Sequence, residues 1–208
     1  MYLGEKKMYR KASWWLHRIL DMVTFKLGMY ELSGLYRMRP MIKFIKEHYG
    51  NELTGVEIGT YEGYNAYCMM LNLPIKKLYL VDPYLFYEEY YEDSYKMSQH
   101  SFDVIFKNAR NLLKDYKNKV EFIRLLSHEA KNKIPKALDF VYIDGNHAYE
   151  FVMQDIKDYY PKLRKGGVIG GHDFDGNYIG VVRAAIEFTD ENNLELYTSE
   201  GDWWTVKK

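Results

Sequence analysis

The feature that most constrains the fold is a regular alternation of strand-like and helix-like segments after about residue 53. Five short apolar stretches predict strands, at residues 54–58, 77–81, 120–125, 139–143 and 167–171. The stretches between them have helical spacing. Strand–helix alternation specifies a parallel sheet that is covered by helices on both faces. We therefore expect a doubly wound α/β fold.

The clearest of the predicted helices spans residues 148–160 and is followed by Pro161, which helps to end it. One face carries apolar side chains at helical spacing, namely Tyr149, Val152, Ile156 and Tyr159. The acidic side chains of Asp155 and Asp158 are expected to face water, together with Gln154.

The C-terminal part of the chain departs from the alternation. After a predicted helix at 179–191, two short strand-like stretches follow directly on one another, at 194–198 and 203–206. The residues between them include Gly201, which favours a hairpin turn. We expect a mostly parallel sheet of seven strands, in which a strand of this C-terminal hairpin runs antiparallel.

The first fifty residues have a different pattern. Leu16, Leu20 and Leu27 recur at helical spacing, and a second short helix is expected after Pro40. We interpret residues 1–50 as an N-terminal helical cap and residues 51–208 as a single globular unit. A basic helix with two tryptophans, lying on a membrane surface, would produce the same N-terminal pattern, so that alternative stays open.

Composition limits the classes of partner. Basic and acidic residues both number 29, so the chain lacks the basic excess with which proteins bind nucleic acids. Its one cysteine, Cys68, is expected to be a buried and inert thiol. No segment approaches the ~18 apolar residues of a membrane span. We expect a cytoplasmic protein, and a homo-oligomer is left open.

A turn with two glycines follows the first predicted strand. Residues 56–63 read Val-Glu-Ile-Gly-Thr-Tyr-Glu-Gly, and a helix is expected directly afterwards. Glycine lets the backbone approach a ligand, and a helix N-terminus offers unpaired N–H groups. Gly59 and Gly63 have G-x-x-x-G spacing, which differs from the dinucleotide fingerprint and disfavours NAD. Glycines that serve turn geometry alone remain the alternative.

An acidic residue, Asp82, ends the second predicted strand about 20 residues further on. A carboxylate at this position can accept hydrogen bonds from ribose hydroxyls. The alternative is an aspartate that starts a turn before Pro83. Both the glycine turn and Asp82 belong to the same edge of the sheet, which favours a nucleoside site there.

Five motifs in order give the chain a family resemblance: VEIGTYEGYNA, LYLVDPY, FIRLLSHEA, LDFVYIDGNHAYEFV and LRKGGVIGGHDF. From residue 56 to about 188, it resembles the class I methyltransferases, and among them small-molecule O-methyltransferases similar to the macrocin and catechol enzymes. The resemblance implies a cofactor, S-adenosylmethionine, and a set of residues that bind it: Glu57, Gly59, Thr60, Gly63, Asp82, Ser127, His128 and Asp144. For Ser127, a helix cap is a compatible structural role.

Three further polar residues follow the fourth and fifth predicted strands. Asp144, His172 and Asp173 are expected to converge at the carboxyl edge of the sheet, where they form a plausible set for Mg²⁺ or another divalent ion. The metal-dependent enzymes that the chain resembles use carboxylate and amide oxygens here, so His172 is a departure. Hydrogen-bonding roles without a metal are the alternative.

His147, together with Asp144, is the candidate for catalysis. An imidazole with an ordinary pKa of about 6.5 suits removal of a hydroxyl proton near neutrality. A structural histidine at the start of the 148–160 helix is the alternative. The expected acceptor is the hydroxyl group of a small molecule or a sugar. A catalytically silent binding or scaffolding protein, or an enzyme that acts on nitrogen, remains open.

Overall fold

The computed structural model describes residues 38–50, 52–85 and 97–208, and it divides into two compact units, Met1–Met38 and Arg39–Lys208. The second unit contains the sheet and the helices that cover it. The first helix predicted in the N-terminal cap lies outside the described residues. The second is present as α2 (Pro40–His48), and it belongs to the same unit as the sheet.

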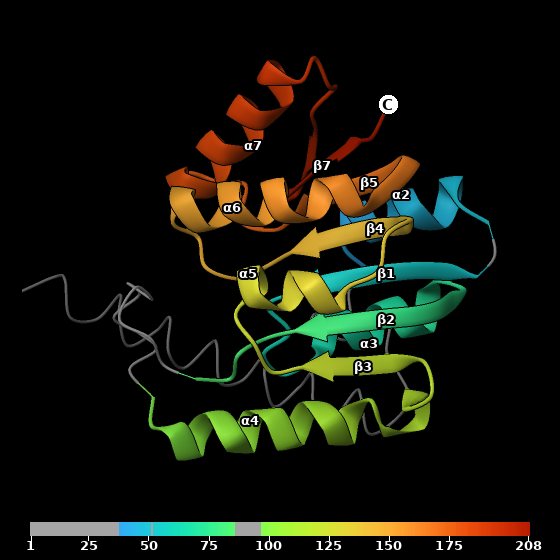
Figure 1. The fold of residues 1–208 in the computed structure, drawn as a ribbon, viewed down its shortest axis with the longest axis vertical. Coiled ribbons are helices and arrows are strands. Elements are labelled where there is room, and N and C mark those ends of the chain that lie inside the picture. Colours follow the sequence, from blue (N-terminus) through green and yellow to red (C-terminus); the bar gives the residue numbers. More distant parts are fainter. Residues whose placement is uncertain (1–37, 51, 86–96) are drawn as a thin grey trace, which may run out of the picture. The chain divides into compact units, whose positions relative to one another are not determined.

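The described part of the chain forms a seven-stranded sheet, in the order β3-β2-β1-β4-β5-β7-β6 (Figure 1). The first five strands in the chain run parallel, and β7 runs antiparallel to both of its neighbours. Their bounds are β1 (Leu53–Ile58), β2 (Ile75–Val81), β3 (Val120–Ile123), β4 (Leu138–Ile143), β5 (Leu163–Gly171), β6 (Tyr197–Ser199) and β7 (Asp202–Val206). The predicted doubly wound fold, with its antiparallel C-terminal strand, is confirmed.

Helices cover both faces of the sheet. One face packs against α5 (Ser127–Ala130), α6 (Tyr149–Tyr159) and α7 (Ile179–Glu191), and α5 and α6 lie in front of the strands in Figure 1. The other face is covered by α2, α3 (Tyr64–Asn72) and α4 (Gln99–Leu112), with α3 behind the strands in the same view. The described residues also contain three short 3₁₀ helices, η4 (Lys114–Tyr116), η5 (Lys131–Lys133) and η6 (Tyr160–Lys162).

Buried apolar side chains on both faces explain why these segments form the sheet. On the face covered by α6 and α7, Val56 of β1, Val141 of β4 and Ile169 of β5 are fully buried. Cys68 of α3 is also buried, and burial raises the pKa of its thiol to about 11, as expected for an inert cysteine. Within the described ranges, no helix is long and apolar enough to cross a membrane.

The strand boundaries differ from the sequence prediction by one to four residues, most at β5 and in the C-terminal hairpin. β5 begins at Leu163, four residues earlier than expected, because Leu163 pairs with Leu138 of β4. In the C-terminal hairpin, Ser199 pairs with Asp202, so the turn has only two central residues, Glu200 and Gly201. Both have positive φ angles, +46° and +87°, as a type I′ turn requires.

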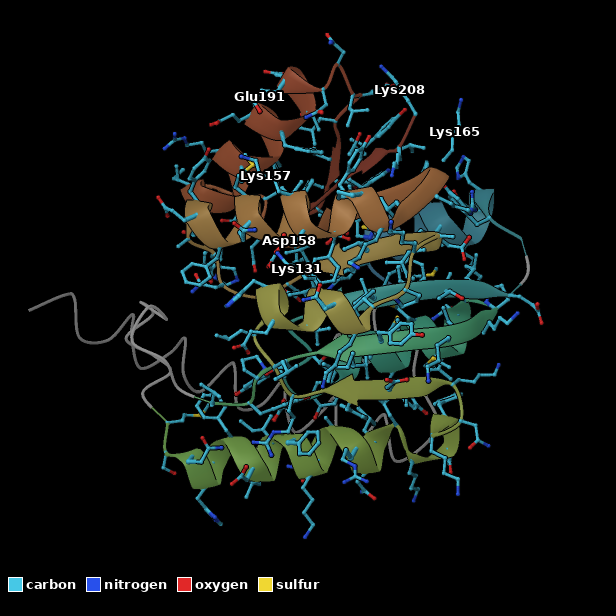
Figure 2. The ribbon with its side chains drawn as sticks, in the orientation of Figure 1. Lys131, Lys157, Asp158, Lys165, Glu191 and Lys208 are labelled. Carbon is cyan, nitrogen blue, oxygen red and sulfur yellow. The ribbon has the colours of Figure 1, made fainter. Side chains whose placement is uncertain are left out.

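The prediction that Asp155 faces water is wrong. Asp155 is only 4% exposed, because α5 covers this part of α6. An ion pair joins α6 to η5, which directly follows α5: Lys131 Nζ lies 2.8 Å from Asp158 Oδ1 (Figure 2). Side chains of a second helix decide which polar residues of an amphipathic helix reach solvent.

Candidate functional site

A glycine turn joins β1 to α3. β1 ends at Ile58, and α3 begins at Tyr64 with Gly63 as its N-cap residue. Gly59 and Gly63 have φ angles of +85° and +82°, in the left-handed region that glycine tolerates best. A Cβ atom on Gly59 would lie 2.0 Å from the backbone oxygen of Asp144. The turn therefore packs against the end of β4 more closely than any side chain would allow.

Asp82 holds this turn in place from the end of β2. Its Oδ2 atom accepts hydrogen bonds from the backbone N–H groups of Thr60 at 3.0 Å and Tyr61 at 2.8 Å. Its Oδ1 atom accepts from the N–H of Tyr84 at 2.8 Å. Burial raises the pKa of Asp82, and the three N–H donors oppose this shift. Because each carboxylate oxygen has two lone pairs, Asp82 retains the capacity for the predicted ribose contact.

A cavity of about 380 Å³ opens at the carboxyl ends of the parallel strands. It lies where the strand order reverses direction between β1 and β4, the usual ligand site of such sheets. The predicted site residues that line it are Gly59, Thr60, Gly63, Asp82, Ser127, His128, Asp144, His147 and Asp173. Glu57 and His172 are not among the lining residues.

Buried polar atoms beside the glycine turn lack hydrogen-bond partners among the described residues. They are Glu57 Oε2, Thr60 Oγ1 and Asn65 Oδ1. Glu57 is 1% exposed, and its Oε1 atom accepts a hydrogen bond from Asn65 Nδ2 at 2.9 Å. Burial raises the pKa of Glu57 to about 8. Thr60 and Asn65 line the cavity, and unpaired buried polar atoms are costly, so this end of the cavity fits a ligand with hydrogen-bonding groups.

The opposite end of the cavity is formed by α5 and α6. Ser127 is the first residue of α5, and Leu126 is the N-cap residue, so the predicted helix-cap role of Ser127 is wrong by one position. Ser127 forms a hydrogen bond with the buried carboxyl of Asp155, whose pKa is raised by burial to about 7. Asp155 also lines the cavity. Sequence reasoning missed it because its helical spacing places it on the polar side.

The carboxyl ends of β4 and β5 bring two histidines to one carboxylate. His147 Nε2 lies 2.8 Å from Asp173 Oδ2, and His172 Nδ1 lies 2.9 Å from Asp173 Oδ1. Burial opposes ionisation of Asp173, but the two imidazole hydrogen bonds bring its pKa below the usual range. The pKa of His172 is raised, because its hydrogen bond to Asp173 and nearby carboxylates outweigh the effect of burial.

The backbone of Asp173 is in the left-handed region, with a φ angle of +62°. Residues other than glycine are uncommon there, although aspartate tolerates the conformation better than most. The next residue, Phe174, donates its backbone N–H to the carbonyl of Gly201 at 2.9 Å. The hairpin between β6 and β7 therefore helps to hold the turn that presents Asp173 to both histidines.

A residue that sequence reasoning missed, Arg39, enters the same end of the cavity. Its Nη1 atom lies 2.8 Å from Asp144 Oδ2 and donates to the hydroxyl of Tyr142 at 3.0 Å. The hydroxyl of Tyr142 donates in turn to Asp202 Oδ1 at 2.8 Å. Arg39 directly precedes α2, and nothing in its local sequence pattern indicates a partner 105 positions away.

The residues whose possible metal-ligand atoms lie close together differ from the predicted set. Among the described residues, Asp144, His147 and Asp173 offer ligand atoms within 4.8 Å of one another, whereas His172 is outside this group. However, Arg39 already pairs with Asp144, and imidazoles pair with both oxygens of Asp173. The donor set therefore does not fit a divalent ion as it stands, and we derive no step through a metal.

Comparison with known proteins identifies the family. Residues 56–174, more than half of the chain, match the family described as a methyltransferase domain. The chain belongs to this methyltransferase family. The family resemblance predicted from the five motifs is confirmed.

One curated relative and several solved structures are similar to this chain. A protein of Acanthamoeba polyphaga mimivirus, itself uncharacterized, is 32% identical over 124 residues, or 60% of this chain; the match spans 52% of that relative, about half its length. The O-methyltransferase NovP has a TM-score of 0.58 at 16% identity, over 86% of this chain and 80% of its own. The methyltransferase PaMTH1 of Podospora anserina, solved with SAH, has a TM-score of 0.58 at 12% identity, over 81% and 76%. The two solved structures share the fold.

Proposed function

We propose that this chain transfers a methyl group to a hydroxyl group of a small molecule or sugar, and that His147 accepts the hydroxyl proton. The observation that carries the proposal is the 2.8 Å contact between His147 Nε2 and Asp173 Oδ2 in the cavity wall. An imidazole paired with a carboxylate is a common arrangement for a general base. The shared fold with NovP, an O-methyltransferase by name, supports the same reaction class.

The cofactor end of the cavity has the groups that S-adenosylmethionine requires. When bound, the cofactor supplies a methyl group on a positively charged sulfur. Thr60 and Asn65 line the cavity with unpaired oxygens that suit an amino group, and Gly59 lets the backbone approach. The resemblance assigns the adenine end to Ser127 and His128, which line the opposite part of the cavity.

The proton has a defined route at the acceptor end. His147 Nε2–H donates to Asp173, so the lone pair of the neutral ring is on Nδ1. The bound cofactor would give its methyl group to the acceptor oxygen and keep the electron pair of the broken bond on its sulfur. The hydroxyl proton passes to His147, and Asp173 stabilises the resulting imidazolium. Asp144 acts beside them as the carboxylate that holds Arg39 in the cavity wall.

The chain as a whole supports a small acceptor. A cavity of about 380 Å³ is of the size that accommodates small molecules. The formal net charge of zero does not favour a nucleic acid. The expected divalent metal is left out of the proposed reaction, because Arg39 places a positive charge 2.8 Å from Asp144 and two imidazoles pair with Asp173.

The test is transfer of label from tritiated S-adenosylmethionine to a panel of catechols, glycosides and amines. We expect labelled hydroxyl compounds, and a rate lower by roughly 10²–10⁴-fold in His147→Ala, the usual contribution of a general base. His100→Ala is the matched control, because His100 is an exposed residue of α4. Label found only on amines, or a full rate in His147→Ala, would contradict the proposal.

A further inference from the structure

The guanidinium of Arg39 is held in one position by three elements of the fold. It donates to Tyr142, which belongs to β4, and it pairs with Asp144 directly after that strand. The Tyr142 hydroxyl donates to Asp202 of β7, so its oxygen is left to accept from Arg39. The second oxygen of Asp202 accepts from the backbone N–H of Met41 in α2 at 3.1 Å.

Burial makes this arrangement costly to lose. Tyr142 and Asp202 are both fully buried, and Arg39 and Asp144 keep only 29% and 20% of their side chains exposed. A buried carboxylate and a buried hydroxyl need their partners, because water cannot replace them. The chain therefore fixes Arg39 at the acceptor end of the cavity, which it lines.

The carboxylates at this end already have partners within the chain. Asp144 pairs with the guanidinium of Arg39, and both oxygens of Asp173 pair with imidazoles. A divalent ion bound to Asp144 would lie next to the guanidinium that is already 2.8 Å from this carboxylate. Like charges that close repel strongly in a partly buried site.

We propose that Arg39 fills the cation position of the acceptor site, so that its guanidinium, and not a divalent ion, holds Asp144 and faces the acceptor. Arg39 is then a positioning residue that replaces the metal of the metal-dependent enzymes that the chain resembles. The inference rests on the proposed function only in treating this end of the cavity as the acceptor site. Whether Arg39 excludes a metal is measurable without any acceptor.

The experiment measures Mn²⁺ binding through loss of the free-ion electron paramagnetic resonance signal, with S-adenosylhomocysteine present. We expect little binding to the wild type. Arg39→Met should bind Mn²⁺ roughly 10- to 100-fold more tightly, the scale on which a neighbouring charge changes a carboxylate equilibrium. Adding Asp144→Asn to Arg39→Met should abolish the gain, and Arg39→Lys, which keeps the charge, should bind as weakly as the wild type.

Arg183→Met is the matched control, because Arg183 is 63% exposed and pairs with Glu187 on the surface of α7. Its Mn²⁺ binding should equal that of the wild type. Calorimetry of S-adenosylhomocysteine verifies that each variant is folded, and Arg39→Gln, which retains N–H donors, takes the place of Arg39→Met if the latter is unstable. Saturable Mn²⁺ binding by the wild type that is lost in Asp144→Asn would overturn the proposal. An unchanged Mn²⁺ affinity after neutralisation of Arg39 would also overturn it. Neither result depends on whether the acceptor atom is oxygen.

Discussion

Replacement of Gly59 by alanine tests how closely the glycine turn packs against the end of β4. Two costs combine at this position. The φ angle of +85° disfavours a residue with a Cβ atom by about 1–2 kcal/mol. The new Cβ would also lie 2.0 Å from the backbone oxygen of Asp144, far inside ordinary contact, and overpacking of this kind costs about 1–3 kcal/mol. We expect a total destabilisation of about 2–5 kcal/mol.

Two other glycines separate these costs. Gly63 has a φ angle of +82°, but a Cβ atom there would have its nearest neighbour 3.4 Å away, so Gly63→Ala should lose only about 1–2 kcal/mol. A Cβ atom on Gly176 would meet no other atom within 4 Å, and Gly176→Ala should stay within about 0.5 kcal/mol of the wild type.

Thermal unfolding followed by circular dichroism measures all three variants. For a chain of this size, the loss in Gly59→Ala corresponds to a fall in Tm of roughly 4–20 °C. Titration with S-adenosylhomocysteine should show weaker binding to Gly59→Ala, because the turn must move away from β4. Equal stability of Gly59→Ala and Gly63→Ala would refute the argument from close packing against Asp144.

Three further predictions concern buried polar groups. The pKa of Glu57 is raised from its ordinary value of 4.5 to about 8, so between these pH values the folded chain keeps a proton that the unfolded chain releases. The free energy of unfolding should therefore fall as pH rises from about 4.5 to about 8. Urea unfolding of Glu57→Gln should lack this decline. Tyr142→Phe removes a hydroxyl that bridges Arg39 and Asp202, and it should lower the free energy of unfolding by about 1–3 kcal/mol in urea. Tyr197→Phe, which removes an exposed hydrogen bond, should change it by less than about 0.5 kcal/mol. Asp173→Asn should lower the pKa of His172, which histidine NMR titration measures; an unchanged pKa would show that other carboxylates raise it.

Much of the cofactor side could be predicted from local sequence. Gly59 and Gly63 indicate a turn because only glycine combines a positive φ angle with close backbone approach. Asp82 lies at the end of β2, where a parallel sheet places it beside that turn. The helix predicted at 179–191 matches α7 at both ends. These features depend on the residue itself and on a few chain neighbours.

The proposed acceptor side was only partly predictable. Asp144, His147 and Asp173 were expected at the same edge, and the cavity includes all three. The structure groups His147 with the two carboxylates and leaves His172 outside this group. This arrangement depends on how the backbone turns at Asp173. A left-handed residue redirects the chain by an amount that the sequence Gly-Gly-His-Asp-Phe does not specify.

The sequence by itself determined the order of strands and helices, the glycine turn and the antiparallel hairpin, because apolar periodicity and glycine conformations are local properties. The tertiary structure alone decided that Asp155 is buried beneath α5 and that Arg39 pairs with Asp144. Contacts between residues far apart in the chain depend on how the elements pack, and the ion pair at the proposed acceptor site is such a contact.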